Sequence, residues 1–349
     1  MDSPEPSIGG SPAKPPAAAA EGAVVGLSEL RQRAGFAHAV DRAARGLVAL
    51  YRGHLLPNRI LNDRGRLALA MYALYLHHTP DSTGVGLTVT RLANLCQETG
   101  VCSRGRAKAM VLLMQWAGFL EAGRPPHPLG TSGRIRPLVP TQRLIAEQTR
   151  RWTNMCGALA IIDPIGSRLL TQLDNPKVFG ALVRHLGRRF ISGTRLTDAA
   201  PAMALFADRD GGLMLAFLLL MSANDGQGSG EVGPFAISIS ALARGCHVSR
   251  AHVLKLVRDA EAENLVYRQP GPDGGVFLAP ALRSGIEAFF ASAFAMMIAG
   301  GREALAEVES PAETGTLPEV LPVPAQRIGD LAPVPCPAAP PQRDPGLRP

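Results

Sequence analysis

The sequence predicts a mainly α-helical protein with small β-hairpins, because one succession of elements occurs twice. Segments 90–139 and 240–280 each read as a short helix, a turn, a longer helix that begins with Ser-Arg, and two strands joined by a turn. This order is typical of a winged helix-turn-helix. We therefore expect a fold with tandem winged helix-turn-helix modules that form an intramolecular pseudo-dimer.

Composition narrows the class of partner. The chain has 349 residues, 46% of them hydrophobic, and a formal net charge of +7. This length allows two or three domains, and the positive charge favours nucleic acid as a partner. The apolar runs 213–223 and 286–299 are shorter than the roughly 18 residues that span a bilayer. We expect no membrane association, and no secretory signal is visible in residues 1–16, so we expect a cytoplasmic, nucleoid-associated protein.

The first half begins with residues 1–25, which are rich in Pro, Ala and Gly and predict a disordered tail. A helix capped by Ser28 follows, and a second one starts after Asn62 or Asp63 and ends before Pro80. Together with the motif that comes next, these helices make up a first module at 26–162.

The first motif starts with a short helix from Thr90, and Gly100 marks the turn that follows it. Ser103 then caps the longer helix, whose apolar residues fall on one face: Ala107, Met110, Val111, Met114 and Ala117. A strand begins at Phe119, a second strand follows a Pro/Gly/Ser-rich turn, and a long helix starts from Thr141.

Asp163, Pro164 and Gly166 indicate a joint at 163–175, and the second module, at 176–307, repeats the first. Aligning Ser103-Arg104 with Ser249-Arg250 also brings Phe119 opposite Leu265. Aligning Pro140 with Pro280 also brings Arg143 opposite Arg283. The first copy is longer by about four residues near 96–99. With only two copies this is a domain duplication, and residues 308–349 predict a Pro-rich disordered tail.

The start of each longer helix carries the residue types that suit DNA. The major groove admits one helix, whose first turns reach base edges. Arginine suits the acceptors of guanine, and serine and lysine suit phosphates. The sequence therefore predicts DNA contacts from Ser103, Arg104, Arg106 and Lys108 in the first motif and from Ser249, Arg250, His252 and Lys255 in the second.

Basic residues of the strand pairs extend this prediction. Arg124, Arg134 and Arg136 in the first motif and Arg268 in the second are expected to follow the DNA backbone or enter the minor groove. Residues 55–155 carry a net charge of about +8, and residues 176–300 one of about +2. We expect the first half to supply most of the salt-dependent affinity.

The first motif resembles the winged helix-turn-helix of MarR-type bacterial regulators. The resemblance rests on LANLCQETGVCSRGRAKAMVLLMQWAGFLEAG and GRIRPLVPTQRL, where Pro-Thr stands in a place that often holds Leu-Thr in that family. Members are usually homodimers with one module per chain. Two modules on one chain depart from that pattern, and the resemblance implies a monomeric pseudo-dimer, or a homodimer of it, that reads an asymmetric site. It also implies a possible small-molecule effector.

The function predicted is that of a sequence-specific transcriptional regulator that binds double-stranded DNA. Two alternatives remain open: a plasmid-type replication initiator, and a chromosome-organising protein whose winged helices contact other proteins. The motifs of phosphate loops, dinucleotide folds and metalloproteases are missing, so we expect neither an enzyme nor a cofactor.

The remaining reactive or aromatic residues have ordinary structural interpretations. The five cysteines show no CxxC spacing, which predicts neither a zinc site nor a disulfide framework, and a redox-sensing thiol is the less favoured alternative to burial. His77 and His78 are adjacent and make a poor metal pair. We expect core or interface positions for four aromatic residues: Tyr72, Tyr75, Trp116 and Trp152.

Overall fold

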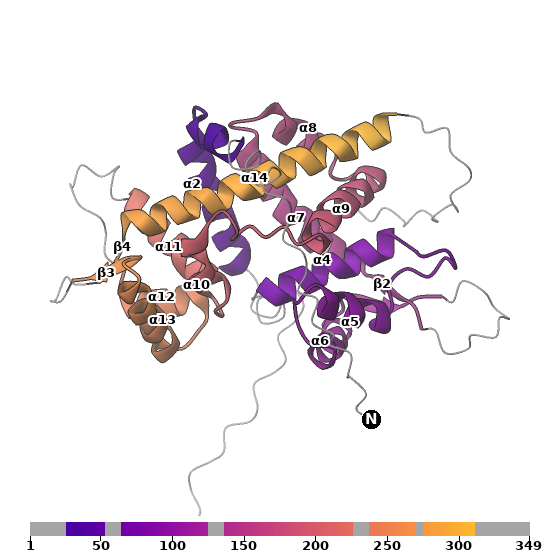
Figure 1. Ribbon diagram of the computed structural model, residues 1–349, viewed down its shortest axis with the longest axis horizontal. Helices are drawn as coiled ribbons and strands as arrows, with labels where there is room; N and C mark the ends of the chain where they lie inside the picture. The colour runs from indigo at the N-terminus through magenta and orange to yellow at the C-terminus, as the bar shows by residue number, and fades with distance from the viewer. Residues whose placement is uncertain (1–25, 53–63, 125–135, 226–236, 270–274, 311–349) are drawn as a thin grey trace, which may run out of the picture. The chain divides into compact units, whose positions relative to one another are not determined.

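The computed structural model describes residues 26–52, 64–124, 136–225, 237–269 and 275–310 (Figure 1). Helices make up 71% of the structure, and the strands of the described part form two antiparallel pairs. The predicted class, mainly α-helical with small β-hairpins, is therefore confirmed. The predicted tail at 1–25 and nearly all of the tail at 308–349 lie outside the described residues.

Two helices precede the first motif, α2 (Phe36–Arg52) and α4 (Arg64–His78). The single helix expected from Ser28 is divided, because residues 26–32 are helical and the chain then turns at 33–35. Gly35 makes this turn with a φ of +81°, a backbone region that disfavours residues with a Cβ. Ser28 therefore lies inside a helical segment and does not cap it.

The first motif contains the four elements that the sequence predicts. They are α5 (Val89–Glu98), α6 (Arg104–Trp116), β1 (Leu120–Ala122) and β2 (Leu138–Pro140). The hydroxyl of Thr88, two residues before the expected start, caps α5 by accepting the N–H of Arg91 at 3.1 Å. The two strands pair antiparallel, and Thr88 forms a further bridge with Pro137.

The middle of the chain is helical throughout. It contains α7 (Gln142–Leu159), α8 (Pro164–Gln172), α9 (Pro176–Ile191), η1 (Pro201–Met203), α10 (Ala204–Ala207) and α11 (Gly212–Asp225). Pro176 occupies the first turn of α9, as expected. The predicted joint at 163–175 thus holds a helix, α8, which packs against α7 and α14.

The second motif repeats the first and leads into the longest helix. Its elements are α12 (Ile239–Cys246), α13 (Arg250–Ala262), β3 (Val266–Arg268), β4 (Val276–Leu278) and α14 (Pro280–Glu309). Ser238 caps α12 as Thr88 caps α5. Ser103 lies fifteen positions after Thr88, and Ser249 lies eleven positions after Ser238, so the first copy is four residues longer, as predicted.

The chain leaves α6 and α13 in the same way. Gly118 and Asn264 both have a positive φ, +70° and +56°, and so turn the chain out of the helix. In consequence Phe119 donates its N–H to Met114 at 2.8 Å, and Leu265 donates its N–H to Ala260 at 2.9 Å. The predicted equivalence of Phe119 with Leu265 is consistent with these matching hydrogen bonds.

The predicted equivalence of Pro140 with Pro280 was wrong by two residues. Leu120 pairs with Pro140 and Val266 pairs with Leu278, so Pro140 corresponds to Leu278. Pro280 instead occupies the first turn of α14. Proline is found both at the end of an edge strand and in the first turn of a helix. The residue type alone therefore did not determine how the two copies align after the second strand.

Arg143 and Arg283, aligned through those prolines, consequently have different partners. Arg143 donates to the carbonyl of Ala117 at 2.8 Å and lies over the ring of Phe119, whose centroid is 4.9 Å away. Arg283 donates to Oδ1 of Asn224 at 3.0 Å. The two arginines hold different elements of the fold together.

Contacts between helices follow one pattern in both halves (Figure 1). Helix α2 packs on α7, and α9 packs on α14. Helix α4, which precedes the first motif, packs on α9, and α11, which precedes the second, packs on α2. Each motif is therefore attached to a helix from the other half of the chain.

The two crossed contacts are specific. Between α2 and α11, Asn224 donates to Asp41 at 2.8 Å, and Arg45 pairs with Asp225 at 2.6 Å. Between α4 and α9, a Cβ added at Gly187 would lie 2.5 Å from the ring of Tyr75, so only glycine permits the observed approach. These contacts link the two motifs through the helical core.

Helix α14 is the only described helix that is long and apolar enough to cross a bilayer, and 56% of its apolar window is buried. It extends beyond the apolar run 286–299 at both ends. Phe290 and Phe294 are fully buried, and each such side chain stabilises the fold by about 2 kcal/mol. The helix contacts α9, α8, η1 and α11, an arrangement typical of a core helix.

Asp163 ties the start of α8 to the N-terminal segment. Its side chain is 4% exposed, accepts the N–H of Ile165 at 3.0 Å, and pairs with Arg33 at 2.7 Å. Burial raises the pKa of Asp163, but the Ile165 N–H and the guanidinium groups of Arg33 and Arg302 outweigh it, so the net pKa is lowered. The stability that Asp163 contributes to the fold is therefore fully present above the pKa of its carboxyl in the unfolded chain. It is lost as the pH falls through the lower pKa of this carboxyl in the folded protein.

We expect Asp163→Ala to lower the free energy of unfolding by about 1–2 kcal/mol at pH 7. The difference from the unsubstituted protein should narrow below about pH 4, because the carboxyl of Asp163 there takes up a proton in the unfolded chain before it does so in the folded one. Urea unfolding from pH 7 to pH 3 measures this, with the exposed Asp174→Ala as a control that should change little. A difference that is the same at every pH would contradict the account.

Candidate nucleic-acid interface

The first turn of α6 presents its basic side chains to solvent. Ser103 caps the helix, and its Oγ accepts the N–H of Arg106 at 3.3 Å. On the inner face Ala107, Val111 and Met114 are fully buried. This burial fixes the rotation of the helix, and Arg104, Arg106 and Lys108 are exposed in consequence.

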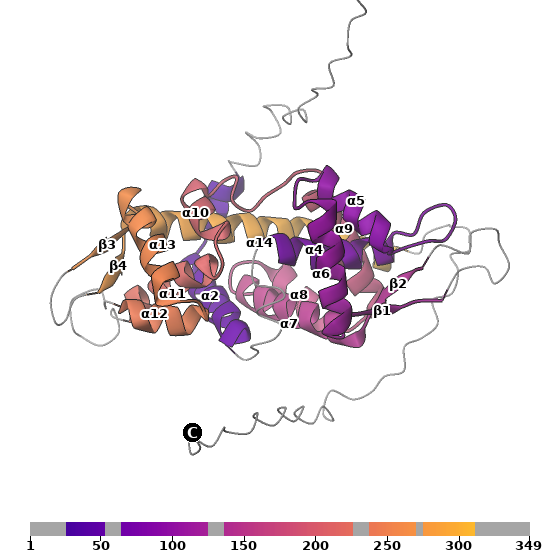
Figure 2. The same ribbon diagram turned by 90° about the horizontal axis from the view of Figure 1, so that it is seen from below.

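The first turn of α13 is built in the same way. Ser249 caps it by accepting the N–H of His252 at 3.1 Å, and its φ and ψ are close to those of Ser103. Its inner face consists of Val253, Leu256, Val257 and Ala260, all buried. Ser249, Arg250 and Lys255 are exposed. Figure 2 shows that a strand pair lies beside each of these helices.

His252 is placed differently from the other predicted contact residues. Its side chain is half-buried, and its Nε2 lies 3.0 Å from the carbonyl oxygen of Asp210 in the segment before α11. The imidazole therefore already has a partner within the protein. Arg250 and Lys255 therefore remain as the exposed cationic side chains in the first two turns of α13.

The strand pairs differ in how their charges are compensated. Arg124, which follows β1, and Arg136, which precedes β2, are both exposed at the turn end of the first pair, whereas Arg134 lies outside the described residues. Arg268 in β3 donates from Nε to Glu261 at 2.8 Å, and this hydrogen bond lowers the pKa of the Glu261 carboxyl. Since the charge of Arg268 is paired, the second strand pair offers less positive charge than the first.

Sequence reasoning missed an apolar strip on α6. Leu112 and Trp116 are 67% and 75% exposed. The core or interface position expected for Trp116 is therefore not found within this chain, although Tyr72 and Trp152 are buried as expected. The helical spacing could have predicted this exposure, because position 116 lies on the same helix face as positions 105, 109 and 112, opposite the buried residues.

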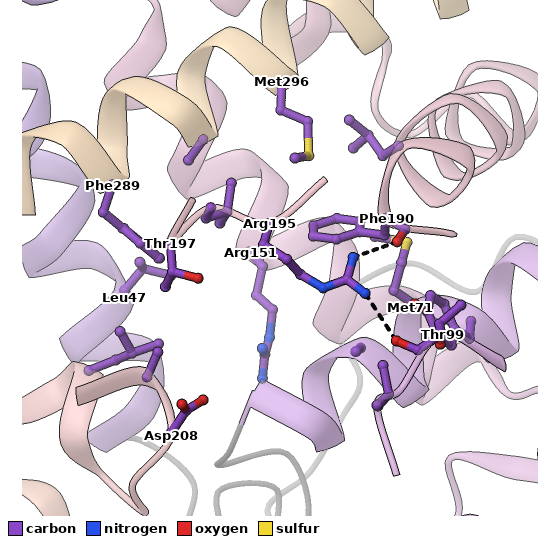
Figure 3. A pocket seen from close by; sticks show the side chains of 18 of the residues that line it. Leu47, Met71, Thr99, Arg151, Phe190, Arg195, Thr197, Asp208, Phe289 and Met296 are labelled. Carbon is purple, nitrogen blue, oxygen red and sulfur yellow. Dashed lines mark hydrogen bonds between the residues drawn. The ribbon is translucent and has the colours of Figure 1, made fainter. Parts of the chain in front are cut away.

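A cavity of about 800 Å³ lies among α4, α7, α9 and α14 (Figure 3). Both halves contribute, with Tyr72 and Met155 from the first and Phe190, Phe289 and Met296 from the second. Arg106 and His252, from the first turns of α6 and α13, also line it. Sequence reasoning did not find this cavity, because its walls come from helices far apart in the chain.

Arg195 connects this cavity to the turn between α5 and α6. Its guanidinium donates to the carbonyls of Phe190 at 2.7 Å and Thr99 at 3.2 Å, as Figure 3 shows. Thr99 is the C-cap of α5. The end of α9 is thereby linked to the loop that leads into α6.

Thiols and acidic groups give no sign of a metal centre in the described chain. No group of three or more His, Cys, Asp and Glu residues among them could hold an ion. Cys96, Cys156 and Cys246 are buried, and Cys102 is half-buried. Burial raises the pKa of Cys156 to about 12, which makes this thiol a poor nucleophile.

Comparison with known proteins found no matching family model, no matching curated protein and no matching solved structure. The resemblance to MarR-type regulators therefore rests on the motif residues alone. Any function has to be argued from the geometry of this chain.

Proposed function

We propose that this protein is a sequence-specific regulator of transcription that binds double-stranded DNA through two winged helix-turn-helix modules. The modules are residues 26–162 and 176–307, and they form an intramolecular pseudo-dimer. The observation that carries the proposal is the matched pair of serine-capped helices, α6 and α13, each with an exposed arginine directly after the cap. Exposed arginine at this place is suited to base edges in the major groove.

The pattern of helix contacts supports the pseudo-dimer. Each helix that precedes a motif, α4 or α11, packs on a helix of the opposite half, α9 or α2. Such an exchange is what two subunits of a symmetric dimer would show if they were joined into one chain. We infer that no partner chain is required to bring two motifs together.

The two modules would read unlike sequences. Arg104, Arg106 and Lys108 surround the start of α6, whereas the start of α13 offers Arg250 and Lys255 and has its histidine engaged with Asp210. Arg268, on the second strand pair, is also engaged by Glu261. We therefore propose an asymmetric site in which the first module contributes the larger share of the electrostatic affinity.

Selection from a random duplex library tests this proposal. The purified protein should enrich a defined sequence, bind it much more tightly than a scrambled duplex, and lose affinity steeply between about 50 and 200 mM salt. Nanomolar binding that does not depend on sequence would contradict a regulator and favour a general DNA-organising role.

The exposed strip of Leu112 and Trp116 favours a second candidate, in which α6 contacts another protein. Large exposed apolar side chains on one helix face are a feature of protein interfaces. This candidate predicts that no duplex changes its mobility in the presence of the protein even at low salt. Trp116→Ala should then abolish partner binding and leave folding intact.

A further inference from the structure

The turn between α5 and α6 brings two cysteines together. Cys96 lies in the last turn of α5, and Cys102 directly precedes Ser103, the cap of α6. The N–H of Cys102 donates to the carbonyl of Cys96 at 3.3 Å. Residues joined by such a bond have their Cα atoms at about the 4.4–6.8 Å that a disulfide spans. The backbone of this turn can therefore accept a disulfide.

The two side chains also face each other, with unequal access to solvent. Cys96 is fully buried, whereas Cys102 is half-buried. Burial raises the pKa of the Cys96 thiol to about 12, and the thiol of Cys102, to which it is hydrogen-bonded, adds to this rise. Cys96 is therefore inert toward molecules in solution, and Cys102 is the thiol of the pair that an oxidant can reach.

The second motif has the same side-chain contact without the second thiol. Counted from the helix caps, Cys246 corresponds to Cys96. Val248 corresponds to Cys102, because each directly precedes the serine cap of the longer helix. Atoms of both Cys246 and Val248 would lie 3.2 Å from a Cβ added at Gly211, so these two side chains are neighbours as well. Valine is thus sufficient for the packing of this turn, and the fold does not require a thiol at position 102.

We propose that Cys96 and Cys102 form a reversible disulfide when the protein meets hydrogen peroxide. The Cys102 sulfur takes one oxygen from the peroxide as the O–O bond breaks, so that a sulfenic acid forms and water leaves. The Cys96 sulfur then attacks the Cys102 sulfur, the S–O bond breaks, and the leaving hydroxide takes the proton of the Cys96 thiol. Two thiols and one peroxide give one disulfide and two waters, and a dithiol reductant restores both thiols.

The close contact explains how a buried thiol can carry out the second step. A thiol with so high a pKa is a poor nucleophile toward solutes, but Cys96 lies beside its target. Holding two reacting groups together replaces a bimolecular collision with an effectively unimolecular step. The disulfide therefore forms before a second peroxide can oxidise Cys102 further.

The disulfide lies at the entrance to a helix that we propose reads DNA. Thr99, between the two cysteines, accepts a hydrogen bond from Arg195 at 3.2 Å, and Cys102 directly precedes the cap of α6. A covalent bond across this turn draws it towards α5 and shifts the first turn of α6. We expect the oxidised protein to bind its selected duplex at least about fivefold more weakly, a consequence that rests on the proposed function. Formation of the disulfide does not rest on it.

Peptide mapping of the full chain without reductant tests the site, because trypsin releases both cysteines in one peptide, residues 92–104. The folded protein is treated with a small molar excess of hydrogen peroxide, and the remaining thiols are then blocked in urea. Peptide 92–104 should carry no blocking group and weigh two hydrogen atoms less. Dithiothreitol before the blocking step should reverse both changes. The peptide that contains the buried Cys156 should be blocked in full.

Three variants assign the reaction to its two sulfur atoms. Cys102→Val introduces the residue type of the second motif, should fold normally, and should leave Cys96 reduced and blocked. Cys96→Ala should stop the reaction at the sulfenic acid of Cys102, which dimedone traps. Cys246→Ala is the matched control, since it removes the corresponding buried thiol of the second motif and should still yield the disulfide in peptide 92–104.

Three results would overturn the proposal: two blocking groups on peptide 92–104 after peroxide treatment, a disulfide that forms only when the protein is first unfolded, or a disulfide from Cys102 to any other cysteine. A protein that forms the disulfide but binds no DNA would contradict the proposed function alone. A protein that binds DNA but forms no disulfide would contradict this site alone. Equal affinity for DNA in both redox states would contradict the expected shift of α6.

Discussion

An Arg104→Ala variant is expected to bind its selected duplex more weakly by about 1–3 kcal/mol, or at least about fivefold. Arg104 follows the cap of α6 directly and is exposed, while the buried Ala107, Val111 and Met114 fix the helix beneath it. Loss of its guanidinium removes a contact to bases or phosphates without disturbing the core. Fluorescence anisotropy with the labelled duplex at fixed salt measures the change.

Arg168→Ala is the matched control for this prediction. It also removes one exposed guanidinium, whose partner is the exposed Glu309, but it lies on α8 and away from both motifs. Its affinity for DNA should stay within about twofold of that of the unsubstituted protein. Equal losses in the two variants would mean that only the net charge matters, and this would contradict a specific role for α6.

A Gly166→Ala variant is expected to lose about 2–3 kcal/mol of unfolding free energy, and more if the helices cannot separate. A Cβ at position 166 would lie 2.3 Å from the backbone nitrogen of Ala160 and 2.7 Å from the carbonyl oxygen of Cys156. Both are backbone atoms of the end of α7, so neither can move aside as a side chain could. Urea unfolding followed by circular dichroism measures the loss.

Gly105→Ala provides the comparison, since nothing lies within 4 Å of a Cβ added there. Alanine in the first turn of α6 should leave stability unchanged or raise it by about 0.5 kcal/mol. If both variants lost the same stability, the close approach of α7 and α8 at Gly166 would have no energetic importance.

The sequence was sufficient to predict the elements that depend on local chemistry. Ser103 was recognised as a helix cap because serine is preferred there and an apolar stripe follows, and Ser249, which was aligned with it, caps α13 in the same way. The burial of Ala107, Val111 and Met114 followed from their helical spacing. Both strand pairs were placed because Pro/Gly-rich turns separate short apolar runs.

Features that depend on contacts across the chain could not be predicted. Pro164 and Gly166 indicate a break when read locally, but Gly166 lies in α8 and permits its close approach to α7. Trp116 looked like a core residue by type, and only the rotation of α6 shows that it is exposed. The cavity gave no signal, because its walls come from α4, α7, α9 and α14.

The most direct test of the account is to select DNA sites with the unsubstituted protein, with Arg104→Ala and with Arg250→Ala, and to compare the three sequences. The account predicts one site with two unlike parts at a fixed separation, of which Arg104→Ala relaxes one part and Arg250→Ala relaxes the other. If both variants selected the unchanged sequence, or relaxed the same part, the claim that α6 and α13 read one duplex together would be wrong.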